Sequence, residues 1–161
     1  MIFKIRKGKH RNIFKWFFPF FTFKKKLKCS ICLLGDHKYY FNTKDEQIKT
    51  NKLVGLSDNY YHRKDSIRIG YRFYNDKYDL MIYYYNNSEN LSQAIGEIHE
   101  DLEFNIEFEI LNDKYLVKYD GNVYYFNRTS KWKLLRYYTY PYFGGENPSP
   151  KDIEISIVIK K

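Results

Sequence analysis

In the ten residues LEFNIEFEIL, 102 to 111, the first nine alternate strictly between apolar and polar side chains. The apolar set is Leu102, Phe104, Ile106, Phe108 and Ile110, and the polar set is Glu103, Asn105, Glu107 and Glu109. Because successive side chains of a β-strand point to opposite faces, this period of two predicts a strand with one face buried and the other in water. Such half-buried strands are typical of antiparallel sheets.

The same period recurs along the chain. SIRIGYRFY (66–74) and DIEISIVIK (152–160) predict further half-buried strands, the latter with Ile153, Ile155, Ile157 and Ile159 inward. YDLMIYYY (78–85) is apolar on both faces, which suits a central strand or a strand whose outer face is a binding surface. Turn-favouring residues separate these runs, namely Asn75-Asp76, Asn86-Asn87, Asn112-Asp113, Asp120-Gly121 and Asn127.

Composition agrees with an all-β fold. The chain has 161 residues with 18 Tyr and 13 Phe but a single Ala, and rings fit a pleated sheet better than a helix. We count nine or ten strands without strand–helix alternation, and we therefore predict one domain over 1–161, a two-sheet β-sandwich of jelly-roll type. A short helix within 89–97 is an alternative to a strand there, although Gly96 disfavours helix.

Positive charge is concentrated at the N-terminus. Residues 1–28 hold ten of the 28 basic residues and no acidic one, while the remaining 18 basic residues face 19 acidic ones. We predict a basic aromatic loop or arm over 8–26 that meets a polyanion or an acidic protein face, unless it is only a solvated loop. The predicted partner-binding residues are Lys4, Arg6, Lys7, Arg11, Phe17, Phe18, Phe20, Phe21, Lys24, Lys25 and Lys26.

The apolar run inside this segment, Trp16 to Phe23, does not predict a membrane span. It is far shorter than the roughly 20 residues that a spanning helix needs, and it contains Pro19. Three lysines follow it instead of a small-residue cleavage site, so we recognise no secretory signal. Packing on the fold or docking on a partner is favoured over a wedge in a membrane surface.

Candidate catalytic and metal-binding patterns are weak. Cys29 and Cys32 are three residues apart on a predicted strand and so point to opposite faces, and the four histidines are isolated; we predict no metal and no cofactor. Glu103-x-Asn105-x-Glu107 is similar to the Glu-x-Asp-x-Glu strand of jelly-roll β-glucanases, but its middle residue is Asn and the alternation continues as a solvated face would. We therefore assign no catalytic residue.

Two loops have recognition potential. NYYHRKDS (59–66) gathers rings, an imidazole and cations before a strand, and YPYFGGENPSP (140–150) holds three of the four prolines and two adjacent glycines. A possible recognition loop therefore comprises Tyr60, Tyr61, His62, Arg63, Tyr142 and Phe143. The alternative is that His62 and Ser66 only satisfy backbone groups where the strand starts.

These segments resemble those of small uncharacterised jelly-roll-like all-β proteins of gut bacteria and their tailed phages. Matching residues are Lys52, Leu53, Gly55, His62, Ser66, Arg68, Ile69, Gly70 and Arg72, then Pro141, Tyr142, Phe143, Gly144, Gly145, Pro150, Asp152 and Ile153. The chain departs from that pattern at Tyr71, where Trp is expected, and at Lys151, where His is expected. The resemblance implies a structural, virion-associated module and does not imply an enzyme.

The leading hypothesis is thus a non-enzymatic accessory or decoration protein of a phage particle, located in the virion or the host cytoplasm, that binds other virion proteins through its N-terminal segment. The alternative is a carbohydrate-binding module whose stacking platforms are tyrosines such as Tyr60, Tyr61, Tyr83, Tyr85 and Tyr142. Nucleic-acid binding by the basic arm is a third hypothesis, and it predicts strong salt dependence.

Overall fold

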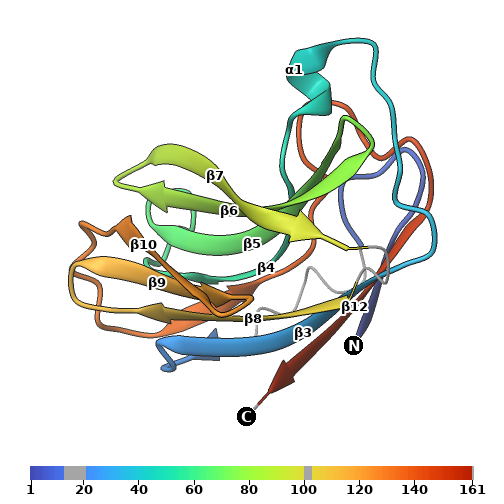
Figure 1. The fold of residues 1–161 in the computed structure, drawn as a ribbon. Coiled ribbons are helices and arrows are strands. Elements are labelled where there is room, and N and C mark those ends of the chain that lie inside the picture. Colours follow the sequence, from blue (N-terminus) through green and yellow to red (C-terminus); the bar gives the residue numbers. More distant parts are fainter. Residues whose placement is uncertain (13–20, 100–102, 161) are drawn as a thin grey trace.

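The computed structural model describes residues 1–12, 21–99 and 103–160 and consists mainly of β-strands (Figure 1). The strands are β1 (Ile2–Ile5), β2 (Phe21–Thr22), β3 (Lys26–Leu34), β4 (Asn51–Ser57), β5 (Ser66–Tyr74), β6 (Lys77–Asn86), β7 (Glu89–Ile98), β8 (Glu103–Ile110), β9 (Lys114–Tyr119), β10 (Asn122–Asn127), β11 (Arg136–Thr139) and β12 (Ile153–Lys160). One helical turn, α1 (Lys44–Gln47), precedes β4.

The strands form two antiparallel sheets that pack face to face (Figure 1). The first sheet has the order β1-β12-β3-β8-β9-β10, and the second has the order β2-β11-β4-β5-β6-β7. This arrangement confirms the predicted all-β, two-sheet sandwich.

The core lies between the sheets and is built from the apolar sets that the period of two identified. β8 contributes Phe104, Ile106 and Phe108 from the first sheet, and β5 contributes Ile67 and Ile69 from the second. Burying side chains of this size stabilises a fold by about 1.5–3 kcal/mol each. One inward prediction is wrong, since Ile159 is 44% exposed near the end of β12.

Residues 89–97, for which a short helix was the alternative, belong to strand β7. They pair with β6 from Asn86↔Glu89 to Tyr78↔Ile98, with one register shift opposite Leu80 and Met81. Long-range pairing thus decides this segment against helix. The ring-rich run WKLLRYYTY (132–140) suits a longer strand, but β11 covers only Arg136–Thr139.

Tight turns join the successive hairpins at or next to the predicted positions. Asn75 and Asp76 both have positive φ between β5 and β6, as do Asn87 and Ser88 between β6 and β7. Asn and Asp tolerate this left-handed backbone better than other non-glycine residues, which is why the sequence marks the turns.

The described part of the N-terminal segment belongs to the sandwich. β1 pairs with β12, the amide of Gly8 donates to the carbonyl of Ser149 at 2.8 Å, and the amide of Phe143 donates to the carbonyl of His10 at 2.7 Å. The predicted contact residues Phe17, Phe18 and Phe20 lie outside the described residues. Within the described ranges, no helix has the length and apolar character that crossing a bilayer requires.

Candidate functional site

A groove with a volume of about 860 Å³ lies on the outer face of the second sheet. Its floor comes from β4, β5, β6 and β11, and its walls come from the loops around residues 60–63 and 140–142 and from the N-terminal segment. The lining residues include Phe3, Arg11, Asn12, Phe21, Lys52, Tyr60, Tyr61, His62, Arg63, Arg68, Tyr83, Tyr85, Tyr137, Thr139, Pro141 and Tyr142.

Arg68 lies at the centre of the floor. Its neighbours Ile67 and Ile69 point into the core, so the alternation of β5 directs Arg68 to the outer face. Register places a row of four residues across β11, β4, β5 and β6, namely Thr139, Gly55, Arg68 and Tyr83. Arg68 therefore lies within this row on the outer face and does not point into the core.

Gly55 makes this position possible. A Cβ on Gly55 would lie 2.2 Å from the carbonyl oxygen of Ile67 and 2.8 Å from Cγ of Arg68. The Arg68 stem thus passes over a backbone position that has no side chain. Only glycine leaves that space.

The floor holds polar atoms that lack partners. Arg68 is 8% exposed and its Nε has no hydrogen-bond partner. Oγ1 of Thr139 on the floor also has none, and neither has Oγ of Ser66, which lies on the same face of β5 but outside the groove lining. Burial lowers the pKa of Arg68, and the nearby tyrosines Tyr83, Tyr85 and Tyr137 oppose that shift. Buried polar atoms normally have partners, so three unpartnered atoms on one face of a sheet are unusual.

Lys52 adds a second cation beside Arg68. Its Nζ lies 4.4 Å from the ring centre of Tyr83 and 5.8 Å from that of Tyr142. Burial lowers the pKa of Lys52 to about 8, and the charges of Arg68 and Lys49 act in the same direction. The ammonium is thus held between rings, where cation–π attraction partly replaces water.

His62 and Tyr137 form a hydrogen-bonded pair on the groove wall. The backbone amide of His62 donates to Oη of Tyr137 at 3.0 Å, and Nδ1 of His62 lies 2.9 Å from the same oxygen. Burial lowers the pKa of His62 to about 4, helped by Arg68 and Arg63, so the imidazole is neutral at pH 7. Because Oη already accepts the amide proton, the hydroxyl proton is directed to Nδ1 when the imidazole carries its proton on Nε2.

Rings stand along the groove at several angles. Tyr142 stacks on His10 with ring centres 5.1 Å apart and an interplanar angle of 11°. The hydroxyl of Tyr83 donates to that of Tyr85 at 3.2 Å, and the two rings are nearly perpendicular. Tyr60 on the opposite wall is 72% exposed. The groove therefore offers flat apolar surfaces beside hydroxyl groups.

The charged side chains of the described groove lining are all positive. Arg11, Arg63, Arg68 and Lys52 line it, and the described lining residues include no Asp or Glu. An acid-free, partly desolvated cleft lined by cations concentrates positive potential, and it attracts negatively charged groups.

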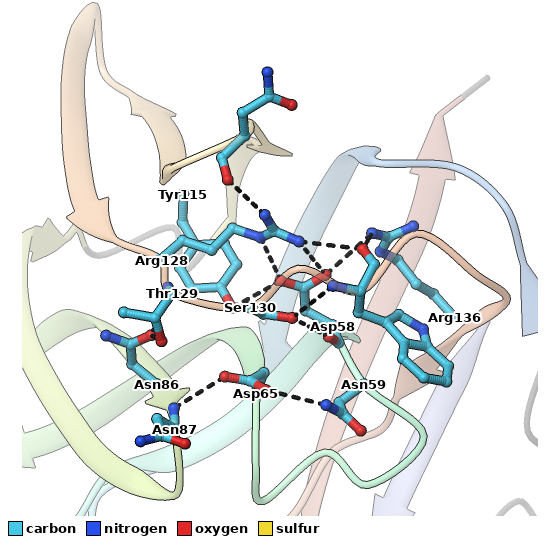
Figure 2. Close-up of polar contacts among 12 residues, drawn as sticks. Asp58, Asn59, Asp65, Asn86, Asn87, Tyr115, Arg128, Thr129, Ser130 and Arg136 are labelled. Atoms are coloured by element: carbon cyan, nitrogen blue, oxygen red, sulfur yellow. Dashed lines mark hydrogen bonds and ion pairs between the residues drawn. The ribbon is translucent and has the colours of Figure 1, made fainter.

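A buried ionic cluster holds the wall in place (Figure 2). Asp58 accepts from Nε of Arg128 at 2.5 Å, from Nη2 of Arg136 at 3.0 Å and from the hydroxyl of Tyr115 at 3.1 Å. Arg136 is 1% exposed and precedes Tyr137, so its inward contact turns Tyr137 toward the groove. Asp58 also begins the loop that carries His62. The cluster thus ties both members of the His62–Tyr137 pair to one anchor.

The structure brings together most of the predicted recognition loop. Tyr60, Tyr61, His62, Arg63 and Tyr142 line the groove. Phe143 is 1% exposed and packs in the core against Tyr39 and Phe41, so its predicted place in a recognition surface is wrong.

The described residues of the predicted N-terminal partner-binding set separate into three groups. Arg11 and Phe21 line the groove. Lys4 pairs with Asp152 and Glu154, and Lys26 pairs with Glu107 and Glu109. The remaining described residues of that prediction, Arg6, Lys7, Lys24 and Lys25, are exposed and lie outside the groove lining.

Sequence reasoning did not select Arg68, Lys52 or Tyr137 as site residues. One signal was available for Arg68, because an arginine between two inward isoleucines on a central strand must face outward. That signal does not reveal that loops distant in sequence enclose the outer face.

The carboxylates of β8 belong to a different face. Glu107 accepts from Lys26 and Lys28, with Nζ–Oε distances of 2.7 and 2.9 Å, on the outer face of the first sheet. Partial burial opposes its ionisation, but these two lysines lower the pKa of Glu107 to about 2. It is therefore a half-buried partner in ion pairs with these lysines.

Neither Cys29 nor a cluster of metal ligands offers a reactive site in the described residues. Burial raises the pKa of the Cys29 thiol to about 12, which makes it unreactive. Within 1–12, 21–99 and 103–160, no group of three or more His, Cys, Asp or Glu side chains is placed to hold a metal ion.

Comparison with known proteins identifies the fold. No family model matches the chain, and no curated protein matches its sequence. The structure is similar to that of the alginate lyase AlyC3, with a TM-score of 0.62, 11% identity, and coverage of 99% of this chain and 74% of that one. It is also similar to the endo-1,3-β-glucanase (laminarinase) catalytic domain of Thermotoga petrophila, with a TM-score of 0.58, 10% identity, and coverage of 98% and 74%. A third is the GH16 protein of a Bacteroides ovatus mixed-linkage glucan locus, with a TM-score of 0.55, 10% identity, and coverage of 99% and 80%.

These similarities correct two predictions. The leading hypothesis of a phage-particle component and the prediction that the chain is not an enzyme are both contradicted, because the three similar structures named above are an alginate lyase, a laminarinase and a GH16 protein. The physical reason for the error lies in the N-terminal segment. Its described cations were interpreted as a free docking arm, whereas β1 is a sheet strand and Lys4 and Lys26 are engaged in ion pairs. The resemblance to phage and gut-bacterial proteins stays a prediction.

Proposed function

We propose that this protein binds a carbohydrate chain in the groove of the second sheet. One observation carries the proposal: an open groove of about 860 Å³ presents tyrosine rings beside hydroxyl and cationic groups. Sugar rings have apolar faces that stack on aromatic side chains and hydroxyls that need hydrogen-bond partners. The likeness in fold to an alginate lyase solved with dimannuronate and to β-glucanases supports the same class of ligand.

Tyrosine substitutions test this proposal. We expect Tyr142→Ala and Tyr60→Ala each to weaken binding of a responsive glycan about tenfold, since one lost stacking surface corresponds to roughly 1–1.5 kcal/mol. Tyr125→Ala is the matched control, because Tyr125 is 60% exposed on β10 and does not line the groove. The measurement is a glycan array followed by affinity electrophoresis in gels that contain the bound glycans. Equal losses for Tyr125→Ala and Tyr142→Ala would contradict binding in the groove.

Cleavage of the bound glycan is a second candidate function, and the His62–Tyr137 pair favours it. A neutral imidazole whose Nδ1 lies 2.9 Å from a tyrosine hydroxyl oxygen forms a proton-transfer unit when its proton is on Nε2, and this one faces a cleft where a substrate would lie. Hydrolysis by two carboxylates is not favoured, since the described lining has none. Proton abstraction beside a carboxylate, followed by loss of the neighbouring sugar oxygen, needs only a base and a proton donor.

Product analysis tests this second candidate. We expect new chain ends together with the ultraviolet absorbance of a carbon–carbon double bond when a uronate polymer is incubated with the protein. Tyr137→Phe should abolish the product and retain binding, whereas Tyr85→Phe, which removes a groove hydroxyl without touching His62, should leave cleavage in place. Unchanged product formation by Tyr137→Phe excludes the pair as the proton-transfer unit.

A further inference from the structure

Arg68 differs from the other deeply buried arginines of the described chain. Arg128 and Arg136 both bond the carboxylate of Asp58, with which they form ion pairs. Arg68 is about as well buried, yet no ion pair joins it to a carboxylate among the described residues, and its Nε has no partner. The groove floor thus contains a cation without an anion.

Burying a cation is unfavourable unless an anion or several hydrogen-bond acceptors pair with it. A charge removed from water needs a counter-charge or several hydrogen bonds, and the described groove lining supplies no Asp or Glu. The chain nevertheless supports this arrangement, since Gly55 leaves space for the Arg68 stem. The missing anion is therefore expected from a ligand.

The geometry selects the type of anion. A guanidinium presents a planar fork of N–H donors that matches the two oxygens of a carboxylate. Thr139 lines the groove in the same row as Arg68, and Ser66 lies two residues before Arg68 on the same face of β5; neither Thr139 Oγ1 nor Ser66 Oγ has a hydrogen-bond partner. One buried fork with an unpartnered hydroxyl in the same row suits a single planar acid group. A nucleic-acid backbone instead needs a track of exposed cations.

We propose that the groove takes a glycan that carries carboxylates, a uronic-acid chain, and that Arg68 receives the carboxylate of one sugar at the centre of the floor. This inference rests on the proposed function and specifies the ligand of the same site. The tyrosine rings then hold the sugar faces, and Lys52 lies beside the bound acid as a second cation.

The test compares a polyuronate with the same polymer after reduction of its carboxyl groups to alcohols. Binding is measured by titration calorimetry at constant ionic strength, because the chain has a formal net charge of +9 that attracts any polyanion. We expect the polyuronate to bind at least tenfold more tightly than its reduced form. We expect Arg68→Met to remove that difference, whereas Arg6→Met, which removes the same charge outside the groove lining, should preserve it.

Stability provides an independent measurement. Arg68→Met removes an unpaired buried charge, so its melting temperature should equal or exceed that of the natural chain, whereas Arg136→Met breaks an ion pair and should melt lower. A variant that is well folded and has lost acid binding supports the inference.

Other results overturn it. If the acidic and the reduced polymers bind equally, and Arg68→Met binds them as the natural chain does, Arg68 has no role in binding. Glycan binding in the groove then still stands. Preference for a sulfated glycan or for single-stranded DNA over the polyuronate assigns the groove to a different anion. Failure to bind any of the polymers overturns both the inference and the proposed function.

Discussion

Replacing Asp58 by Asn tests the reasoning about the buried cluster. Asn keeps the size and part of the hydrogen bonding of Asp but removes the charge that faces Arg128 and Arg136, whose nitrogens lie 2.5 and 3.0 Å from its oxygens. All three side chains are at most 6% exposed, so water cannot replace the lost carboxylate. Removing one partner of a buried ion pair typically costs about 3–5 kcal/mol. For a chain of this length the cost corresponds to a fall in melting temperature of about 6–20 °C.

Asp36→Asn is the matched control. Asp36 pairs with Lys151 but its side chain is 65% exposed, so the control should shift the melting temperature by less than about 4 °C. The assay is thermal unfolding followed by circular dichroism at pH 7. Tyr115→Phe provides a milder change, because it removes one hydrogen bond to Asp58 and leaves the charge. If Asp58→Asn melts within the range of Asp36→Asn, the cluster is not the anchor described above and the argument for the placement of Tyr137 fails with it.

Three further predictions concern the groove and the outer face of the first sheet. The pKa of Glu107 is lowered to about 2 from an ordinary value of 4.5, so its contribution to stability is present above pH 4.5 and is lost as the pH falls toward 2. Denaturant titrations should therefore show a smaller loss of unfolding free energy over that range for Glu107→Gln than for the natural chain. Equal losses would contradict the ion pairs with Lys26 and Lys28. Because burial lowers the pKa of Lys52 to about 8, with Arg68, Tyr83 and Tyr142 around it, the ammonium loses its charge as the pH rises through that value; affinity for a polyuronate should fall between pH 7 and 9, and Lys52→Met should flatten the profile. Gly55→Ala places a Cβ 2.2 Å from a backbone oxygen and 2.8 Å from the Arg68 stem, so we expect destabilisation of about 1–3 kcal/mol and weaker polyuronate binding. Thermal unfolding and calorimetry are the measurements. Unchanged stability and affinity would show that the strands and Arg68 shift to accept the methyl group without cost.

The sequence by itself determined the class of fold. Each strand needs only a period of two, and each hairpin needs only residues that accept positive φ, so β5, β8 and the turn at Asn75 and Asp76 follow from local physics. Local patterning also placed Tyr60, His62 and Tyr142 in loops with recognition potential. It failed at β7, where pairing along β6 overrides a weak local preference.

Only the tertiary structure decided which outward face becomes a site. In the sequence Arg68 resembles any solvated cation between two inward isoleucines, and its enclosure depends on groove walls that residues 60–63 and 140–142 supply. The partner of Asp58 is 78 residues away at Arg136, a separation that leaves no periodic trace in the sequence. Alternation fixes the side of a strand on which a residue lies, because that is set by the pleat. Whether that side meets water, a ligand or another part of the chain is set by the packing of distant segments.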